Sequence, residues 1–235
     1  MMQVFCGIVL CVAVAVSALA QEEQAAADSL KGGEMVRIET ENHGFYIDKY
    51  EVTNEEYAAF LTEKGNAKVE GMYWVELGSR YTALVEEKGV YKVKEGFARH
   101  PIIEVSWYGA MAYCQWAGKR LPTQEEWQFA CEGAAGLKYP WGGDFEEGRA
   151  NIFGDKDGYG RTAPVGSFPS GASSFGLLDM GGNVWEWTQG GEKVQFLRGG
   201  SWINGPTLTQ CNKRTNTKDS HSYIKGNTIG FRCAR

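Results

Sequence analysis

Residues 176–202 read GLLDMGGNVWEWTQGGEKVQFLRGGSW. This stretch places three tryptophans, seven glycines and the carboxylates of Asp179 and Glu186 within 27 residues. Each glycine inside a helix costs about 1 kcal/mol relative to alanine, so an ordinary helix is not expected here. Glycine permits positive φ and close backbone approach, and tryptophan supplies a large apolar area. The stretch therefore predicts a tight loop inside the core.

The two carboxylates of this loop need a partner if they are buried beside Trp185 and Trp187. A calcium ion is one such partner, because it binds carboxylate and backbone carbonyl oxygens in a flexible geometry. The residues alone therefore favour a cation held by Asp179 and Glu186.

Further motifs follow in order from about Gly44 to Arg235, which is nearly the whole expected domain. They are GFYIDKYEVTNEEYAAFL, HPIIEVSWYGAMAYCQWAGKRLPTQEEWQFA, YPWGG, ANIF, TAPVGSFP and GFRCAR. Together with GLLDMGGNVWEWT and RGGSW, they resemble the signature of the formylglycine-generating enzyme (sulfatase-modifying factor) family. The resemblance implies an α+β fold, the irregular C-type-lectin-like fold of that family, with short strands, few helices and long loops.

The N-terminus is typical of a secretory signal peptide. Residues 1–20 carry no charged side chain and end in Ala18-Leu19-Ala20, a small-residue cleavage site. Retention as a membrane anchor is the alternative, because the apolar run approaches spanning length. We expect a signal peptide at 1–20, a flexible linker at 21–34 and one domain at 35–235, secreted or periplasmic, without stable membrane insertion after cleavage.

Local patterns predict several elements of this domain. MVRIET and GFYIDKYEVT alternate as half-buried strands do, and IIEV after His100-Pro101 is expected to be a short strand. Capping boxes at Thr53/Glu56 and Thr123/Glu126, and an N-cap at Ser106, predict three helices. Residues 66–99 match the family least, and their WVEL and VYKVK pieces predict a hairpin or an inserted loop.

Four cysteines remain after signal cleavage, and an even number in a secreted chain implies two disulfides with three possible pairings. Spacing does not choose between these pairings. The family resemblance implies Cys114–Cys233 and Cys131–Cys211.

The resemblance also implies two calcium sites. The first would use the Asn151 side chain, the Ile152 carbonyl, the Asp157 carboxylate and the Tyr159 carbonyl. The second would use Asp179, the carbonyls of Gly182 and Val184, and Glu186. For Asn151 and Asp157, ordinary turn chemistry is the alternative.

No catalytic residue is assigned. The enzyme of this family oxidises a substrate cysteine to formylglycine with oxygen, using copper held by two cysteines shortly after the GGS motif. This segment reads GGSWINGPTLTQCNKRTNT, where Asn204 and Thr209 offer no thiolate and Cys211 matches the structural disulfide. Copper(I) prefers soft thiolate ligands, so copper is not expected. The three histidines lack metal-ligand spacing.

The charge of the chain is unevenly distributed. After Trp187 the sequence has eight Lys/Arg against two acidic residues, although the net charge of the whole chain is −5. Solvated surface charge is the simple explanation, and a basic C-terminal face for a protein or an anionic ligand is the alternative. The ligand-facing candidates are Trp202, Asn204 and Arg214. Nucleic acid is not expected, because no basic patch is interleaved with aromatic residues.

Three functions remain open. We favour a secreted, non-catalytic, calcium-stabilised module that binds a ligand or a protein. The first alternative is a formylglycine-generating oxidoreductase acting on a sulfatase cysteine. The second is a variable C-type-lectin-like surface protein of a diversity-generating system.

Overall fold

The computed structural model describes residues 31, 33–40, 43–69, 71–154, 157–190, 194–217 and 225–235. The predicted signal peptide and nearly all of the predicted linker lie outside these residues. In the described part of the chain, no helix is long and apolar enough to cross a bilayer.

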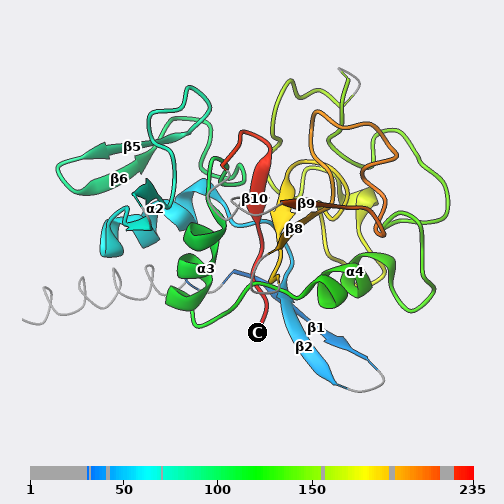
Figure 1. Cartoon of the computed structure of the whole chain (residues 1–235). Coiled ribbons are helices and arrows are strands. Elements are labelled where there is room, and N and C mark those ends of the chain that lie inside the picture. The colour runs from blue at the N-terminus through cyan, green and yellow to red at the C-terminus, as the bar shows by residue number, and fades with distance from the viewer. Residues whose placement is uncertain are drawn as a thin grey trace, which may run out of the picture.

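The domain begins with an antiparallel hairpin. β1 (Met35–Glu39) pairs with β2 (Gly44–Asp48), with Met35 opposite Asp48. The alternating pattern predicted both strands, although β2 ends before the KYEVT residues. Figure 1 shows the hairpin extending away from the rest of the molecule.

Three α-helices begin at the predicted caps. Both capping boxes are present, at the start of α2 (Asn54–Lys64) and α4 (Gln124–Glu132), and Ser106 caps α3 (Trp107–Trp116). Gly65 ends α2, as expected. These starts were predictable because a cap is a local arrangement of three or four residues.

The segment 66–99 forms two small hairpins. β3 (Lys68–Val69) pairs with β4 (Met72–Tyr73), and β5 (Leu84–Glu87) pairs with β6 (Val90–Val93). β6 lies in the VYKVK piece.

The short strand expected at IIEV is not present. Residues 102–105 have no strand, and Val105 forms only an isolated bridge with Val75 of the WVEL piece. Glu104 has φ +59°, which interrupts an extended run, and its neighbours Ile102 and Val105 are still buried. Apolar residues there indicated burial rather than strand pairing.

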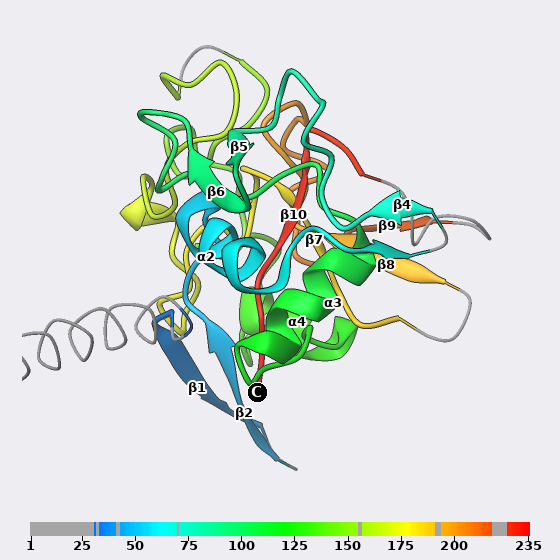
Figure 2. The same ribbon diagram turned by 90° about the vertical axis from the view of Figure 1, so that its left-hand side faces the viewer.

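The largest sheet joins the end of the chain to its middle. Its order is β10 (Ile229–Phe231), β7 (Trp185–Trp187), β8 (Gln195–Arg198) and β9 (Arg214–Thr217), and β10 is parallel to β7. The loop predicted at 176–202 therefore contains two strands of this sheet. In Figure 2 the C-terminal segment, drawn in red, runs through the middle of the molecule.

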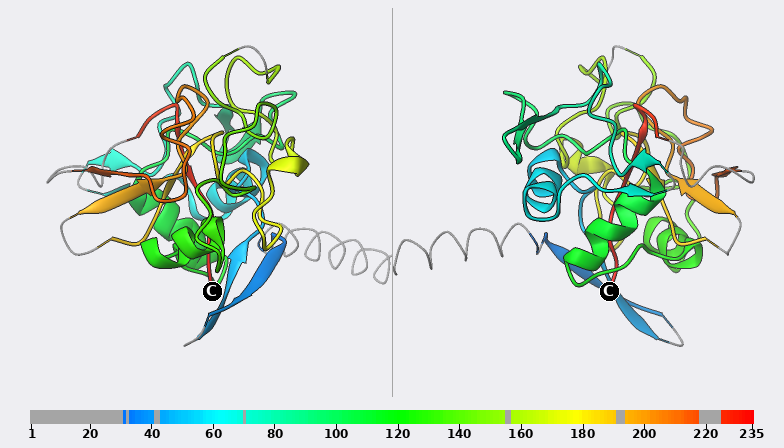
Figure 3. Two further views of the ribbon diagram at one scale, coloured as in Figure 1. Left: turned by 90° about the vertical axis from the view of Figure 1, so that its right-hand side faces the viewer. Right: turned by 60° about the vertical axis from the view of Figure 1, so that its left-hand side comes forward.

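Two apolar clusters make up the core, and each contains a disulfide. The first includes Tyr57, Trp187 and Phe231 with the Cys114–Cys233 bridge; the second includes Trp127 with Cys131–Cys211. The pairings implied by the family resemblance are those in the structure. A single short 3₁₀ helix, η1 (Pro169–Gly171), interrupts the long loops of the described residues. Figure 3 shows that such loops, including 157–168 and 199–213, form much of the upper part of the molecule.

Candidate functional site

The GGSW segment forms a tight turn against residues 208 and 209. Gly199 and Gly200 have φ values of +93° and +74°, which favour glycine. A Cβ added to Gly200 would lie 2.9 Å from the Leu208 carbonyl oxygen and from the Thr209 methyl carbon. The two glycines thus let the backbone approach the later segment and position Ser201 and Trp202.

Oxygen and nitrogen atoms occupy the region that follows this turn. Ser201 Oγ donates to Asn204 Oδ1 at 2.7 Å, and the Asn204 amide donates to the Ser201 carbonyl at 2.8 Å. Thr209 is fully buried, and its Oγ1 donates to the Pro206 carbonyl at 3.0 Å. The side chains of Asn204 and Thr209 are therefore both engaged in local hydrogen bonds, and their oxygen and nitrogen atoms are hard ligands that do not suit copper(I).

All four cysteines of the described residues are in disulfides. Cys211 is bonded to Cys131 and Cys114 to Cys233, with sequence separations of 80 and 119. Cys211 is also completely buried. No thiol is available near Asn204 in the part of the chain that the structure describes.

A buried ionic cluster lies beneath the turn. Arg232 Nε and Nη2 donate to the two oxygens of Glu186 at 2.7 and 2.8 Å, and Trp127 Nε1 donates to Glu186 Oε2 at 2.8 Å. The remaining Arg232 donors reach the carbonyls of Asp48, Lys49 and Leu178. Arg232 and Glu186 are each 0% exposed. The arginine thus has its donors satisfied and supplies the positive charge that Glu186 needs.

Two further carboxyl groups face the same arginine. Burial raises the pKa of Asp179 to about 6, although the Gly166 amide that donates to its Oδ2 opposes the shift. Burial, then the charges of Asp179 and Glu186, raise the pKa of Glu51 well above its usual range. One cation is therefore shared among three buried carboxyl groups, and Glu51 also accepts hydrogen bonds from Asn183 Nδ2 and the Val184 amide.

Asn183 connects this cluster to the turn. Its Nδ2 donates to Glu51 Oε2 at 2.6 Å, and its carbonyl accepts from the Trp202 amide at 3.0 Å. Its Oδ1 accepts from Asn151 Nδ2 and from the Ala163 amide. Asn183 has φ +54°, a conformation that asparagine tolerates better than most residues. The GGSW turn thus rests on a buried polar network.

Comparison with known proteins assigns this arrangement to a family. Residues 18–235 match the model of the sulfatase-modifying factor enzyme 1-like domain. The chain belongs to the sulfatase-modifying factor family. A solved structure, PvdO from Pseudomonas aeruginosa, aligns with a TM-score of 0.62 over 87% of this chain and 91% of that one, at 24% identity. That likeness shows the fold, and the α+β, C-type-lectin-like expectation is confirmed.

Relatives of this family member differ in the activity that their names state. The inactive C-alpha-formylglycine-generating enzyme 2 of Bos taurus is 36% identical, covering 81% of this chain and 76% of that protein. The formylglycine-generating enzyme of Streptomyces coelicolor is 33% identical, with coverage of 81% and 77%. Another relative, the serine/threonine-protein kinase pkn1 of Chlamydia caviae, is 33% identical over 82% of this chain, which spans only 33% of that protein.

Hydrogen bonds join three of the four residues expected at the first calcium site, Ile152, Asp157 and Tyr159. Asn151 is 1% exposed, and its Oδ1 is buried without a hydrogen-bond partner in the described structure. The Asp157 carboxylate accepts from the amides of Ile152 and Tyr159, each at 3.0 Å. These contacts are the turn chemistry named as the alternative, but turn chemistry leaves Asn151 Oδ1 unexplained. An oxygen-binding cation fits that atom.

The second expected set is arranged differently. Gly182 and Val184 flank Asn183, and both oxygens of Glu186 are already engaged by Arg232 and Trp127. A calcium ion there would have to share or displace the arginine. The second calcium site stays a prediction, and Arg232 fills the compensating role that the sequence argument assigned to a cation.

The ligand-facing candidates lie in two places. Trp202 lines a cavity of about 140 Å³, here called the Trp202 pocket, with Asn54, Arg80, Tyr81, Lys94 and Arg161 among its walls. Asn204 belongs to the turn beside it. Arg214 lies on β9, where its guanidinium packs over Phe196 and donates to Gln124.

The described cations of the basic C-terminal segment are also dispersed. Arg198 and Arg232 are 3% and 0% exposed, and Lys225 pairs with Glu76 at 3.1 Å. Arg235 packs over Tyr46 of the N-terminal hairpin. Several of these charges therefore have structural partners rather than a shared surface.

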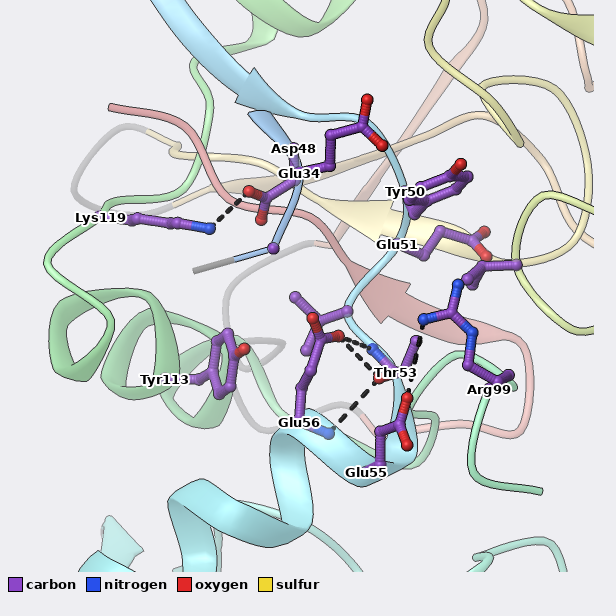
Figure 4. A pocket seen from close by; sticks show the side chains of 13 residues that line it. Glu34, Asp48, Tyr50, Glu51, Thr53, Glu55, Glu56, Arg99, Tyr113 and Lys119 are labelled. Atoms are coloured by element: carbon purple, nitrogen blue, oxygen red, sulfur yellow. Dashed lines mark hydrogen bonds and ion pairs between the residues drawn. The ribbon is translucent and has the colours of Figure 1, made fainter. Parts of the chain in front are cut away.

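A further cavity, of about 490 Å³, is lined by several acidic side chains that have partners among its walls and neighbours (Figure 4). Asp48 bonds Lys119 at 2.6 Å, Glu56 accepts from Thr53, and Glu55 lies 3.6 Å from Arg99. Burial raises the pKa of Asp48 to about 6, despite the opposing effect of Lys119. Since its carboxylates have partners, we assign the cavity a structural role.

Sequence reasoning missed Glu51 and Arg232 as parts of the site. Both lie inside quoted family motifs, YEVTN and GFRCAR, where an ionisable residue stands among apolar neighbours. That setting was a usable signal, because a charge in a buried run requires an opposite charge.

Proposed function

We propose that this chain is a non-catalytic member of the sulfatase-modifying factor family that binds a ligand at the surface around Trp202. The observation that carries the proposal is the chemistry after the GGSW turn. Asn204 and Thr209 offer hard ligands there, and Cys211 is held in a disulfide with Cys131. A copper(I) site of paired thiolates cannot be assembled from these groups.

The remaining support comes from the rigid setting of the turn and from relatives. Asn183 and the buried cluster hold Trp202 beside a cavity, which suits recognition. The similarity to a bovine protein named as inactive agrees with a non-catalytic role. Two disulfides favour a secretory, oxidising location. The Streptomyces relative keeps formylglycine formation as the competing function.

A peptide-oxidation assay separates these two functions. We expect no formylglycine when the purified chain is incubated with copper, oxygen and a peptide bearing Cys-x-Pro-x-Arg, because no thiolate pair is present. Mass spectrometry of the peptide provides the measurement, and an active family enzyme serves as the positive control. Asn204→Cys alone should not create activity, since the second thiolate would still be missing. Copper-stimulated aldehyde formation by the wild-type chain would show that the chain is an enzyme.

Calcium is the structural ion that we propose, held by Asn151 and Asp157 with the carbonyls of Ile152 and Tyr159. Binding to the native state would stabilise it by about 2.7 kcal/mol at a free calcium concentration of 100 Kd. For a domain of this size that corresponds to a rise in Tm of about 5–10 °C. Calcium should restore the Tm after chelation better than magnesium does, because magnesium demands a stricter octahedral geometry.

Matched variants locate this effect. Asp157→Ala should remove most of the calcium dependence of Tm, whereas Asp144→Ala should retain it, because Asp144 is exposed on a neighbouring loop. Differential scanning calorimetry with calcium, magnesium and chelator provides the comparison. Equal Tm values for the wild type in calcium and in chelator would rule out a stabilising calcium site.

A further inference from the structure

The Trp202 pocket has an unbalanced positive charge. Its walls include Arg80, Lys94 and Arg161 but no aspartate or glutamate. None of the three cations forms a salt bridge with another described residue. Lys94 Nζ donates to the Thr82 carbonyl at 2.7 Å, which satisfies one donor without neutralising the charge.

Two of these cations, Arg80 and Arg161, lie over the same aromatic ring, that of Tyr81. The guanidinium carbons of Arg80 and Arg161 lie 4.8 and 4.9 Å from the centre of the Tyr81 ring. Arg80 Nη2 also donates to the Tyr81 hydroxyl at 2.7 Å. Stacking on an aromatic ring leaves other guanidinium N–H groups available to an oxyanion. Two neighbouring cations without a counter-charge favour binding of an anion.

A buried acceptor in the pocket wall places a second requirement on any ligand. Asn54 is 2% exposed, and its Oδ1 has no hydrogen-bond partner in the described structure. Its Nδ2 donates to the carbonyls of Phe97 and His100 at 3.0 and 3.1 Å, which fixes the orientation of the amide. The unpaired atom is therefore an acceptor, and it would be satisfied by an O–H or N–H group.

From these features we propose that the Trp202 pocket binds a small oxyanion that also carries a hydrogen-bond donor. The anion would contact Arg80, Lys94 and Arg161, and the donor would reach Asn54 Oδ1. A 2-hydroxy or 2-amino carboxylate has this chemistry, and so does hydrogen phosphate. The cavity of about 140 Å³ limits the ligand to a small group. The proposal deepens the proposed function, on which it rests, by giving the class of ligand.

Isothermal titration calorimetry on the purified chain tests this with four probes. Glycolate should bind more tightly than acetate, and hydrogen phosphate more tightly than sulfate, because only the first of each pair has a donor at neutral pH. The stronger of the two donor-bearing probes identifies the source as carboxylate or phosphate. Equal binding within both pairs would overturn the role of Asn54.

Variants of exposed residues test the cation part without disturbing the core. Arg80→Gln and Arg161→Gln should each weaken binding of the preferred probe by about tenfold, the loss of a charge-assisted hydrogen bond. Arg37→Gln is the matched control, because Arg37 is an exposed arginine of β1 that pairs with Glu39, and its affinity should equal that of the wild type. Circular dichroism verifies that each variant is folded.

The outcomes remain distinguishable from those of the peptide assay. No saturable binding of any probe, or unchanged affinity in both pocket variants, would overturn the small-anion site. That result together with no formylglycine would leave the non-catalytic assignment intact. Formylglycine formation would overturn that assignment whatever the calorimetry shows.

Discussion

Replacing Arg232 with methionine is expected to lower the free energy of unfolding by about 3–5 kcal/mol, the usual cost of removing one partner from a buried ion pair. Arg232 donates to both oxygens of Glu186 and also faces Glu51 and Asp179. Methionine would fill a similar volume but leave the carboxylate of Glu186 without its counter-charge. Urea unfolding followed by tryptophan fluorescence measures the change.

Two controls isolate the charge from the loss of packing. Arg235→Met removes a nearby arginine that is exposed, so it should cost less than about 1 kcal/mol. Adding Glu186→Gln to Arg232→Met should recover part of the stability, because the stranded charge is then absent. An Arg232→Met variant as stable as Arg235→Met would contradict the assignment of Arg232 as the shared counter-ion.

Removing the Cys114–Cys233 bridge is expected to have an effect of similar size. Replacing both cysteines with alanine should lower stability by about 4–5 kcal/mol, since the chain-entropy model gives about 4.7 kcal/mol for a closed loop of 100 residues. The bridge spans 119 residues and lies in the apolar cluster shared by α3 and the end of the chain. Guanidinium unfolding of the double variant and of the oxidised wild type provides the comparison.

The second bridge serves as a matched comparison. Cys131–Cys211 spans 80 residues, so its removal should cost slightly less in the same model. If either alanine pair unfolded at the same denaturant concentration as the wild type, that bridge would contribute nothing measurable to stability.

Local features of the fold were predictable because their causes lie within a few residues. Thr53 and Glu56 complete a capping box three positions apart, and Thr123 and Glu126 repeat it. The alternating pattern likewise placed β1. The disulfides join residues far apart in the sequence, so spacing left three possible pairings. Only the family resemblance selected one of them.

The site was harder to predict because its contacts join distant residues. Arg232 meets Glu186 across 46 positions, and Asn183 meets Glu51 across 132. The sequence indicated that the carboxylates needed compensation but could not show that an arginine provides it. The Trp202 pocket was missed because its walls also come from distant parts of the chain, from Asn54 to Trp202. In addition, Arg80 lies in the segment that least resembles the family.

The path of the last residues has a consequence for how this domain is made. β10 pairs with β7, and Ala234 bridges both Ile47 and Arg120, so the final segment contacts parts that are synthesised much earlier. A nascent chain that has reached only Thr228 lacks the strand beside β7, the counter-ion of Glu186 and the partner of Cys114. We therefore expect the core to close only after residues 229–235 have been synthesised, and a chain ending at Thr228 to leave the strand position beside β7 empty.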